Sequence, residues 1–302
     1  MKWRAVLPIF WHNFTALRYS FELAQCYLHL RRAGLNADGS CRGFQPAAAD
    51  SDALRRRTRK RTGKARIAVT DRLLPLMLLP GHMCDARLFG PQLAALADRS
   101  VSVADLTDAD SIAGMAQRVL ASAPPHFALL GLSMGGIVAF EILRQAPQRV
   151  GRLALLDTNP FPESEDRSAG RLELMRIVAA GGLKPVVIEQ LKPAYLARSN
   201  RDDLPLLSLI ANMALELGPL VFDRQSRALL ERPDSRLLLA NIRMPTLVLC
   251  GREDALCPLA VHEMMAATIP GATLVVVDAA GHLPTLERPA AVNAAIHCWL
   301  NA

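Results

Sequence analysis

The stretch Gly131-Leu132-Ser133-Met134-Gly135-Gly136 carries the clearest chemical signal in the sequence. It fits the pattern Gly-x-Ser-x-Gly, in which a serine at a sharp turn between a strand and a helix exposes its hydroxyl as a nucleophile. The surroundings agree, because an apolar run at 126–132 precedes the serine and a helix-like sequence follows it. Many ordinary loops fit the same pattern. Ser133 is therefore a candidate nucleophile whose partners must be found elsewhere in the chain.

A serine hydroxyl needs a base to take its proton, and the base needs a carboxylate to hold its tautomer. Two later residues meet these needs, each shortly after an apolar run that predicts a strand: Asp254 follows 246–250, and His282 follows 272–277. The order Ser, Asp, His is one of the orders in which such triads occur along a chain. Asp157, which ends another apolar run, remains an alternative to Asp254 as the acid.

Predicted strands and helices alternate from about residue 73 onward. The strands are expected at 74–79, 100–106, 126–132, 152–156, 246–250 and 272–277, with helices at 91–98, 111–123 and 135–147 and others beginning at 258 and 289. Continuous apolar strands that alternate with helices predict an α/β fold, a mostly parallel sheet with helices on both faces. Ligands of such sheets bind at the carboxyl ends of the strands. The three candidate residues all follow predicted strands at that edge.

Residues 160–244 are helical in pattern throughout, although they lie between two predicted strands. An insertion of helices at this point predicts a lid over the carboxyl edge of the sheet. The segment is rich in Leu, Met, Ile and Val. We therefore expect a pocket that favours apolar, flexible acyl groups.

Four motifs, GLSMGG, GREDALCP, DAAGHLPTLERP and PGHMCD, resemble those of α/β-hydrolases of the serine-esterase and lactonase type, over about residues 73–302. The resemblance implies the α/β-hydrolase fold and a triad of Ser133, Asp254 and His282. It also implies an oxyanion hole formed by the backbone N–H groups of Met134 and His82. The chain departs from the family at Pro80-Gly81, where His-Gly is common. For His82 the resemblance therefore implies only the backbone N–H as an oxyanion donor, and no role for the imidazole. The two strands that commonly come first are not recognisable, although 66–70 could be a remnant.

The expected function is hydrolysis of a carboxylic ester, lactone or thioester of a small-molecule acyl substrate, through an acyl-enzyme on Ser133. The sequence contains no Walker loop, no His-Glu-x-x-His and no cluster of Cys and His, so we expect neither a metal nor a cofactor. Two alternatives remain: a cofactor-free haloperoxidase or perhydrolase with the same triad, and a non-catalytic receptor that retains the triad. Acyl turnover distinguishes the receptor from the enzymes.

Residues 1–66 differ in charge from the rest of the chain. They hold 14 of the 35 basic residues and 4 of the 28 acidic ones, a net charge of +10, while residues 67–302 hold the other 21 and 24, a net charge of −3. A disordered extension or a start assigned too far upstream is favoured over an Arg-rich targeting segment. Binding of nucleic acid or an anionic membrane through 55–66 is disfavoured, because no aromatic residue interleaves its arginines. Residues 67–302 are expected to form the hydrolase domain.

The six cysteines form no Cys-x-x-Cys pair and no regular framework. Scattered cysteines of this kind are typical of reduced thiols, which predicts a cytoplasmic protein. The oligomeric state is not evident from the sequence.

Overall fold

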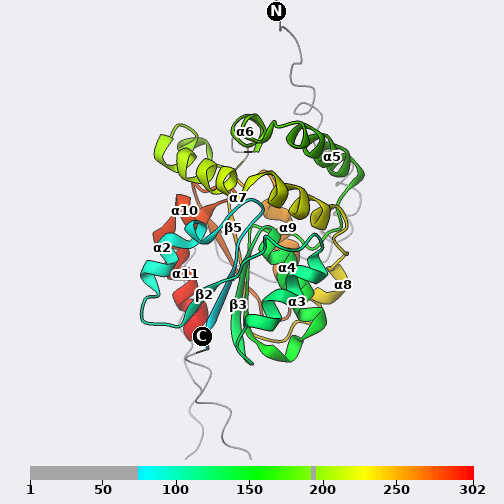
Figure 1. Ribbon diagram of the computed structural model, residues 1–302. Helices are drawn as coiled ribbons and strands as arrows, with labels where there is room; N and C mark the ends of the chain where they lie inside the picture. Colours follow the sequence, from blue (N-terminus) through cyan, green and yellow to red (C-terminus); the bar gives the residue numbers. More distant parts are fainter. Residues whose placement is uncertain (1–73, 192–194) are drawn as a thin grey trace, which may run out of the picture. The chain divides into compact units, whose positions relative to one another are not determined.

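The computed structural model describes residues 74–191 and 195–302, and within them the chain builds one six-stranded sheet (Figure 1). The strands are β1 (Leu76–Leu79), β2 (Val101–Val103), β3 (Phe127–Leu132), β4 (Val150–Leu156), β5 (Thr246–Gly251) and β6 (Thr273–Val277). Their order is β2-β1-β3-β4-β5-β6, and every neighbouring pair is parallel. The predicted α/β class is confirmed, and all six strands lie where the sequence predicts them. The strand expected at 100–106 is shorter than predicted.

Helices cover both faces of the sheet, because successive strand side chains point to opposite sides. On one face, Met77, Leu129 and Leu155 pack with α3, α4 and α9. On the other, Leu78, Leu130 and Leu249 pack with α2 and α11 (Figure 1). These helices are α2 (Gly90–Ala95), α3 (Ile112–Ser122), α4 (Met134–Gln145), α9 (Leu259–Thr268) and α11 (Pro289–Asn301), and two single turns, η2 (Ala86–Phe89) and α10 (Pro284–Glu287), precede α2 and α11. Both apolar cores are thus built from strands that are buried on two sides.

The helices that the structure describes between β4 and β5 belong to one insertion, residues 160–244. They are α5 (Glu165–Ala179), α6 (Leu183–Pro185), the π-helix η4 (Val186–Leu191), the 3₁₀ turn η6 (Arg198–Asn200), α7 (Leu204–Leu230) and α8 (Arg236–Leu239). Val178, Val187 and Phe222 of this insertion pack with Met83, which follows β1. The inserted helices therefore lie at the carboxyl end of the sheet, as predicted (α5, α6 and α7 in Figure 1). That these helices serve as a lid stays a prediction.

Helix α7 is divided by a kink. Gly218 has a φ of 80° and Pro219 follows it, so the helical hydrogen bonds are interrupted there. By length and composition α7 could cross a membrane. The kink leaves two segments, 204–217 and 219–230, each shorter than the roughly 20 residues that a span needs. Ile210, Met213 and Phe222 are buried against the rest of the protein. These features favour a helix of the inserted layer.

Several predictions concern residues outside those described: the basic extension at 1–66, the strand remnant at 66–70 and the cysteines Cys26 and Cys41. Of the described cysteines, Cys84, Cys250 and Cys257 are buried and Cys298 is exposed, and all four are free thiols.

Candidate active site

Ser133 sits at a strained turn between β3 and α4. Its φ of 55° and ψ of −115° lie outside the regions that a residue with a Cβ prefers. The turn can form because glycines flank it. A Cβ at Gly131 would lie 2.3 Å from the Gly135 carbonyl oxygen, and a Cβ at Gly135 would lie 2.0 Å from the Leu79 carbonyl oxygen. The glycines of the motif therefore allow β1, β3 and α4 to approach closely, and the serine is held at the end of its strand.

The structure brings the three predicted triad residues together. His282 Nε2 lies 2.8 Å from Ser133 Oγ, and His282 Nδ1 lies 2.8 Å from Asp254 Oδ2. Because an ionised carboxylate can only accept, the ring proton belongs on Nδ1. Nε2 is then free to accept the serine proton. The side chains of Asp254 and His282 are buried, so bulk water competes little for these bonds.

Asp254 is held by more than the histidine. Its Oδ1 accepts the N–H groups of Leu256 (2.8 Å) and Cys257 (3.0 Å). Burial by itself would raise the pKa of Asp254. The charge and hydrogen bond of His282, together with the two backbone N–H groups, outweigh burial and hold this pKa below its ordinary value. Asp254 is therefore an anion at neutral pH, and Asp157 does not contact the histidine in its place.

A second buried carboxylate, Glu287, holds the histidine loop. Its Oε1 accepts the N–H of Gly281 (2.8 Å), and its Oε2 accepts the N–H of Ala197 (2.7 Å) and the side-chain amide of Asn200 (2.8 Å). The His282 N–H donates to the carbonyl oxygen of Tyr195, at 2.7 Å. The inserted segment and the histidine loop are thus joined by hydrogen bonds. Sequence reasoning missed Glu287, since nothing in the motif that contains it indicates burial.

The two predicted oxyanion donors lie beside Ser133, the candidate nucleophile. Met134 is the first residue of α4, and a Cβ at Gly81, the residue before His82, would lie 3.4 Å from Ser133 Cβ. Within residues 74–191 and 195–302, neither the Met134 N–H nor the His82 N–H has a hydrogen-bond acceptor. The neighbouring Met83 N–H, by contrast, donates to Gln225 Oε1 of α7 at 2.8 Å. The arrangement leaves two backbone donors available near Ser133.

The side chain of His82 is not placed as a base. Its ring packs edge-on against Phe222 of α7, with 5.3 Å between the centroids. Burial, and secondarily the charge of Arg171, lower the pKa of His82 to about 3, so the ring is neutral at neutral pH. Within the described part of the chain, Nε2 of this ring has no hydrogen-bond partner. His262, another buried histidine, accepts the Thr158 N–H at 3.1 Å and serves the structure.

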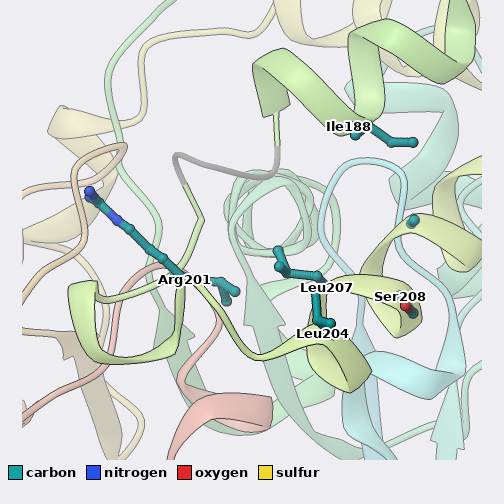
Figure 2. A pocket seen from close by; sticks show the side chains of 7 residues that line it. Ile188, Arg201, Leu204, Leu207 and Ser208 are labelled. Atoms are coloured by element: carbon teal, nitrogen blue, oxygen red, sulfur yellow. The ribbon is translucent and has the colours of Figure 1, made fainter.

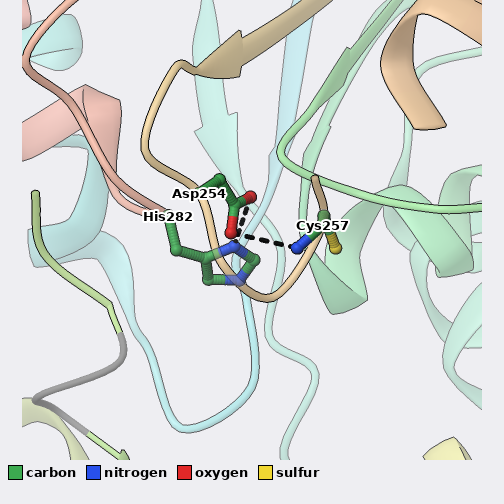
Figure 3. Close-up of side chains that lie close together, drawn as sticks. All are labelled: Asp254, Cys257 and His282. Carbon is green, nitrogen blue, oxygen red and sulfur yellow. Dashed lines mark hydrogen bonds and ion pairs between the residues drawn. The ribbon is translucent and has the colours of Figure 1, made fainter. Parts of the chain in front are cut away.

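Asp254, Cys257 and His282 form a compact group whose potential ligand atoms lie within 4.8 Å of one another (Figure 3). Asp254 and His282 already satisfy each other through a hydrogen bond. Burial, and next the charge of Asp254, raise the pKa of the Cys257 thiol to about 12, so it keeps its proton. A protonated thiol is a poor metal ligand. We attribute the grouping to the triad and do not identify these residues as metal ligands.

The inserted helices line an open hollow of about 370 Å³ (Figure 2). Its lining is mostly apolar: Ile188, Leu196, Leu204, Leu207 and Ala211, with Ser208 and Arg201. The side chain of Arg201 extends away from the leucines. Leu196 follows Tyr195, whose carbonyl oxygen binds the His282 N–H. One lining residue of the hollow, Leu196, is thus the chain neighbour of a residue that is hydrogen-bonded to the histidine loop.

Comparison with known proteins identifies the family. The model of the alpha/beta hydrolase family matches residues 76–295, most of the chain. The chain belongs to the alpha/beta hydrolase family. The hydrolase resembles the pimeloyl-[acyl-carrier protein] methyl ester esterase of Klebsiella pneumoniae, with 30% identity over 60% of this chain and 72% of the relative. The enzyme of the same name from Pectobacterium carotovorum is 27% identical over 75% of this chain and 94% of its own length.

A solved structure gives the same result. A thermophilic esterase from Thermogutta terrifontis superimposes with a TM-score of 0.70 at 31% identity, over 76% of this chain and 89% of the esterase. These relatives confirm the predicted α/β-hydrolase fold and make the protein a carboxylic ester hydrolase of the esterase type. They do not assign roles to its residues.

Proposed function

We propose that this hydrolase cleaves esters of small acyl substrates through an acyl-enzyme on Ser133. The observation that carries the proposal is the continuous chain of hydrogen bonds from Ser133 through His282 to Asp254, with 2.8 Å at each step. These hydrogen bonds lie at the carboxyl edge of a parallel sheet, where ligands of this fold class bind.

In the first half of the reaction, Ser133 Oγ attacks the ester carbonyl carbon while its proton moves to His282 Nε2. The carbonyl oxygen gains the negative charge, and the N–H groups of His82 and Met134 stabilise it. Each such donor is worth on the order of 10²–10³ in rate. The tetrahedral intermediate then collapses, and the alcohol leaves with the proton from Nε2. The acyl group remains on Ser133.

In the second half, water takes the place of the alcohol. It gives a proton to Nε2, attacks the acyl carbon and forms a second oxyanion at the same donors. Collapse breaks the bond to Oγ, which recovers its proton from His282 and releases the acid. Asp254 stays ionised throughout and stabilises the imidazolium that forms in each half.

The hollow among the inserted helices predicts the acyl preference. Each methylene buried there contributes roughly 0.8 kcal/mol, or about fourfold in kcat/KM. With p-nitrophenyl esters of graded length, we expect kcat/KM to rise from acetyl toward medium-length chains. Methyl esters should be included, because the curated relatives are methyl ester esterases of a pimeloyl group. A strict preference for acetyl, or for a charged acyl group, would contradict this assignment of the hollow.

The pH dependence of kcat/KM tests whether His282 acts as the general base. A protonated imidazole cannot accept the proton of Ser133, and imidazoles as a class change charge between about pH 5 and 8. We therefore expect kcat/KM to fall on the acidic side of that range. The measurement is a pH profile on one soluble ester, with folding monitored by circular dichroism at each pH. A flat profile over the whole range would remove His282 from the role of general base.

A further inference from the structure

Asp157 directly follows β4, and Asp254 follows the neighbouring strand β5. The Asp157 N–H donates to the Leu249 carbonyl oxygen at 3.0 Å, which fixes the residue against β5. Its side chain is fully buried, and its φ is 45°, in the left-handed region. The two residues meet at Gly251, whose N–H donates to Asp157 Oδ1 at 2.8 Å and whose carbonyl oxygen accepts the Asp254 N–H at 3.2 Å. The established esterase activity gives Asp157 no role, since the histidine pairs with Asp254.

The two oxygens of Asp157 have different surroundings. Oδ1 accepts the Gly251 N–H at 2.8 Å. Oδ2 is completely buried, and in the described part of the chain no donor reaches it. An ionised oxygen in this position would lack compensation. A protonated Oδ2, by contrast, could donate a hydrogen bond to the Asp254 carboxylate.

The proton of the pair belongs on Asp157. Two neighbouring buried carboxylates cannot both be ionised at moderate cost, so one takes up a proton. Asp254 accepts three donors, from His282, Leu256 and Cys257, whereas Asp157 accepts one. Burial first, and then the charge of Asp254, raise the pKa of Asp157 well above its ordinary value. The other titratable groups that face this pair are Glu287, Cys250, Cys257, His262 and His282.

We propose that Asp157 is a positioning residue, whose protonated carboxyl donates from Oδ2 to the carboxylate of Asp254. A carboxylate has about four acceptor positions, and this bond fills the one that the other donors leave open. The bond fixes the rotation of the Asp254 carboxylate, so that Oδ2 of Asp254 faces His282 Nδ1. The effect on catalysis rests on the proposed function of the triad, but the protonation of Asp157 does not.

Two substitutions distinguish the hydrogen bonds that Asp157 makes from its ability to ionise. In Asp157→Asn, the side-chain oxygen can still accept the Gly251 N–H and the amide can donate to Asp254, whereas Asp157→Ala removes both bonds. We expect Asp157→Asn to keep kcat within about threefold of the wild type, because it replaces the same donor and acceptor. Asp157→Ala should lower kcat by about 10- to 100-fold with little change in KM, since the lost bond involves a charged group. The assay is ester hydrolysis at saturating and at limiting substrate concentration, which gives kcat and KM separately. A loss in Asp157→Asn as large as in Asp157→Ala, or no loss in a folded Asp157→Ala, would overturn the proposal.

The pH dependence of stability tests whether Asp157 is protonated in the folded protein, and it does so even if Asp157→Ala does not fold. Below the ordinary pKa of 3.8, Asp157 is protonated in both the folded and the unfolded chain. Above it, only the unfolded chain releases the proton, so the wild type loses stability relative to Asp157→Asn as the pH rises. We expect the urea midpoint of Asp157→Asn to exceed that of the wild type by a margin that grows as the pH rises above about 4. A margin that is independent of pH would overturn the protonated assignment. This measurement needs no substrate, so failure of the esterase assignment would not affect it.

Discussion

Replacing Ser133 by alanine should lower kcat by a factor on the order of 10⁶, the effect typical of losing the nucleophile of a triad whose members act as a unit. The substitution removes the oxygen that lies 2.8 Å from His282 Nε2, so no acyl-enzyme can form. The fold should persist, because alanine has the same Cβ and can occupy the same turn. Hydrolysis of a p-nitrophenyl ester, measured with wild type and variant at equal concentration, gives the ratio directly.

A matched control is Ser102→Ala, which removes a hydroxyl from an exposed position on β2. We expect wild-type kcat in this variant. A fluorophosphonate probe, which labels activated serines, should modify the wild type and Ser102→Ala but not Ser133→Ala. Substantial turnover by a folded Ser133→Ala variant would show that another group attacks the ester, and the proposed acyl-enzyme would then be wrong.

The main features of the site could be predicted because each triad residue follows a strand whose sequence is strongly apolar. Residues 126–132, 246–250 and 272–277 are continuous apolar runs, and parallel strands bring their carboxyl ends to one edge. The Gly-x-Ser-x-Gly turn indicated Ser133 as the candidate nucleophile, and the order of the strands indicated Asp254 and His282 as its neighbours. For the same reason the insertion between β4 and β5 was visible as a long helical stretch between two strands.

The contacts that support the site could not be predicted, because they join residues far apart in the chain without any periodic pattern. Gln225 on α7 accepts the Met83 N–H, and Glu287 accepts the Ala197 N–H 90 positions away. The backbone strain was only partly visible. Met83, Ser133, Asp157 and Ala279, none of them glycine, have positive φ, and all four follow strands at the carboxyl edge. Only the strain at Ser133 has a sequence motif.

The second large effect is expected from Asp254→Asn, which should lower kcat by on the order of 10⁴ while leaving the fold intact. The reason is the fixed orientation of the new amide. The N–H groups of Leu256 and Cys257 both point at the Oδ1 position, 2.8 and 3.0 Å away, so the oxygen of the introduced side chain must face them.

The NH₂ group of the introduced amide then faces His282 Nδ1, where the wild type has a carboxylate oxygen at 2.8 Å. Two donors cannot face each other, so the ring proton moves to Nε2 and the histidine can no longer accept the proton of Ser133. The matched control is Asp157→Asn, which makes the same substitution after the adjacent strand but replaces a neutral carboxyl, and it is expected to keep kcat within about threefold. Kinetics of the two variants on one ester, with melting curves for folding, compare the two acids directly. Full activity in a folded Asp254→Asn variant, together with loss in Asp157→Asn, would assign the catalytic acid to Asp157 instead.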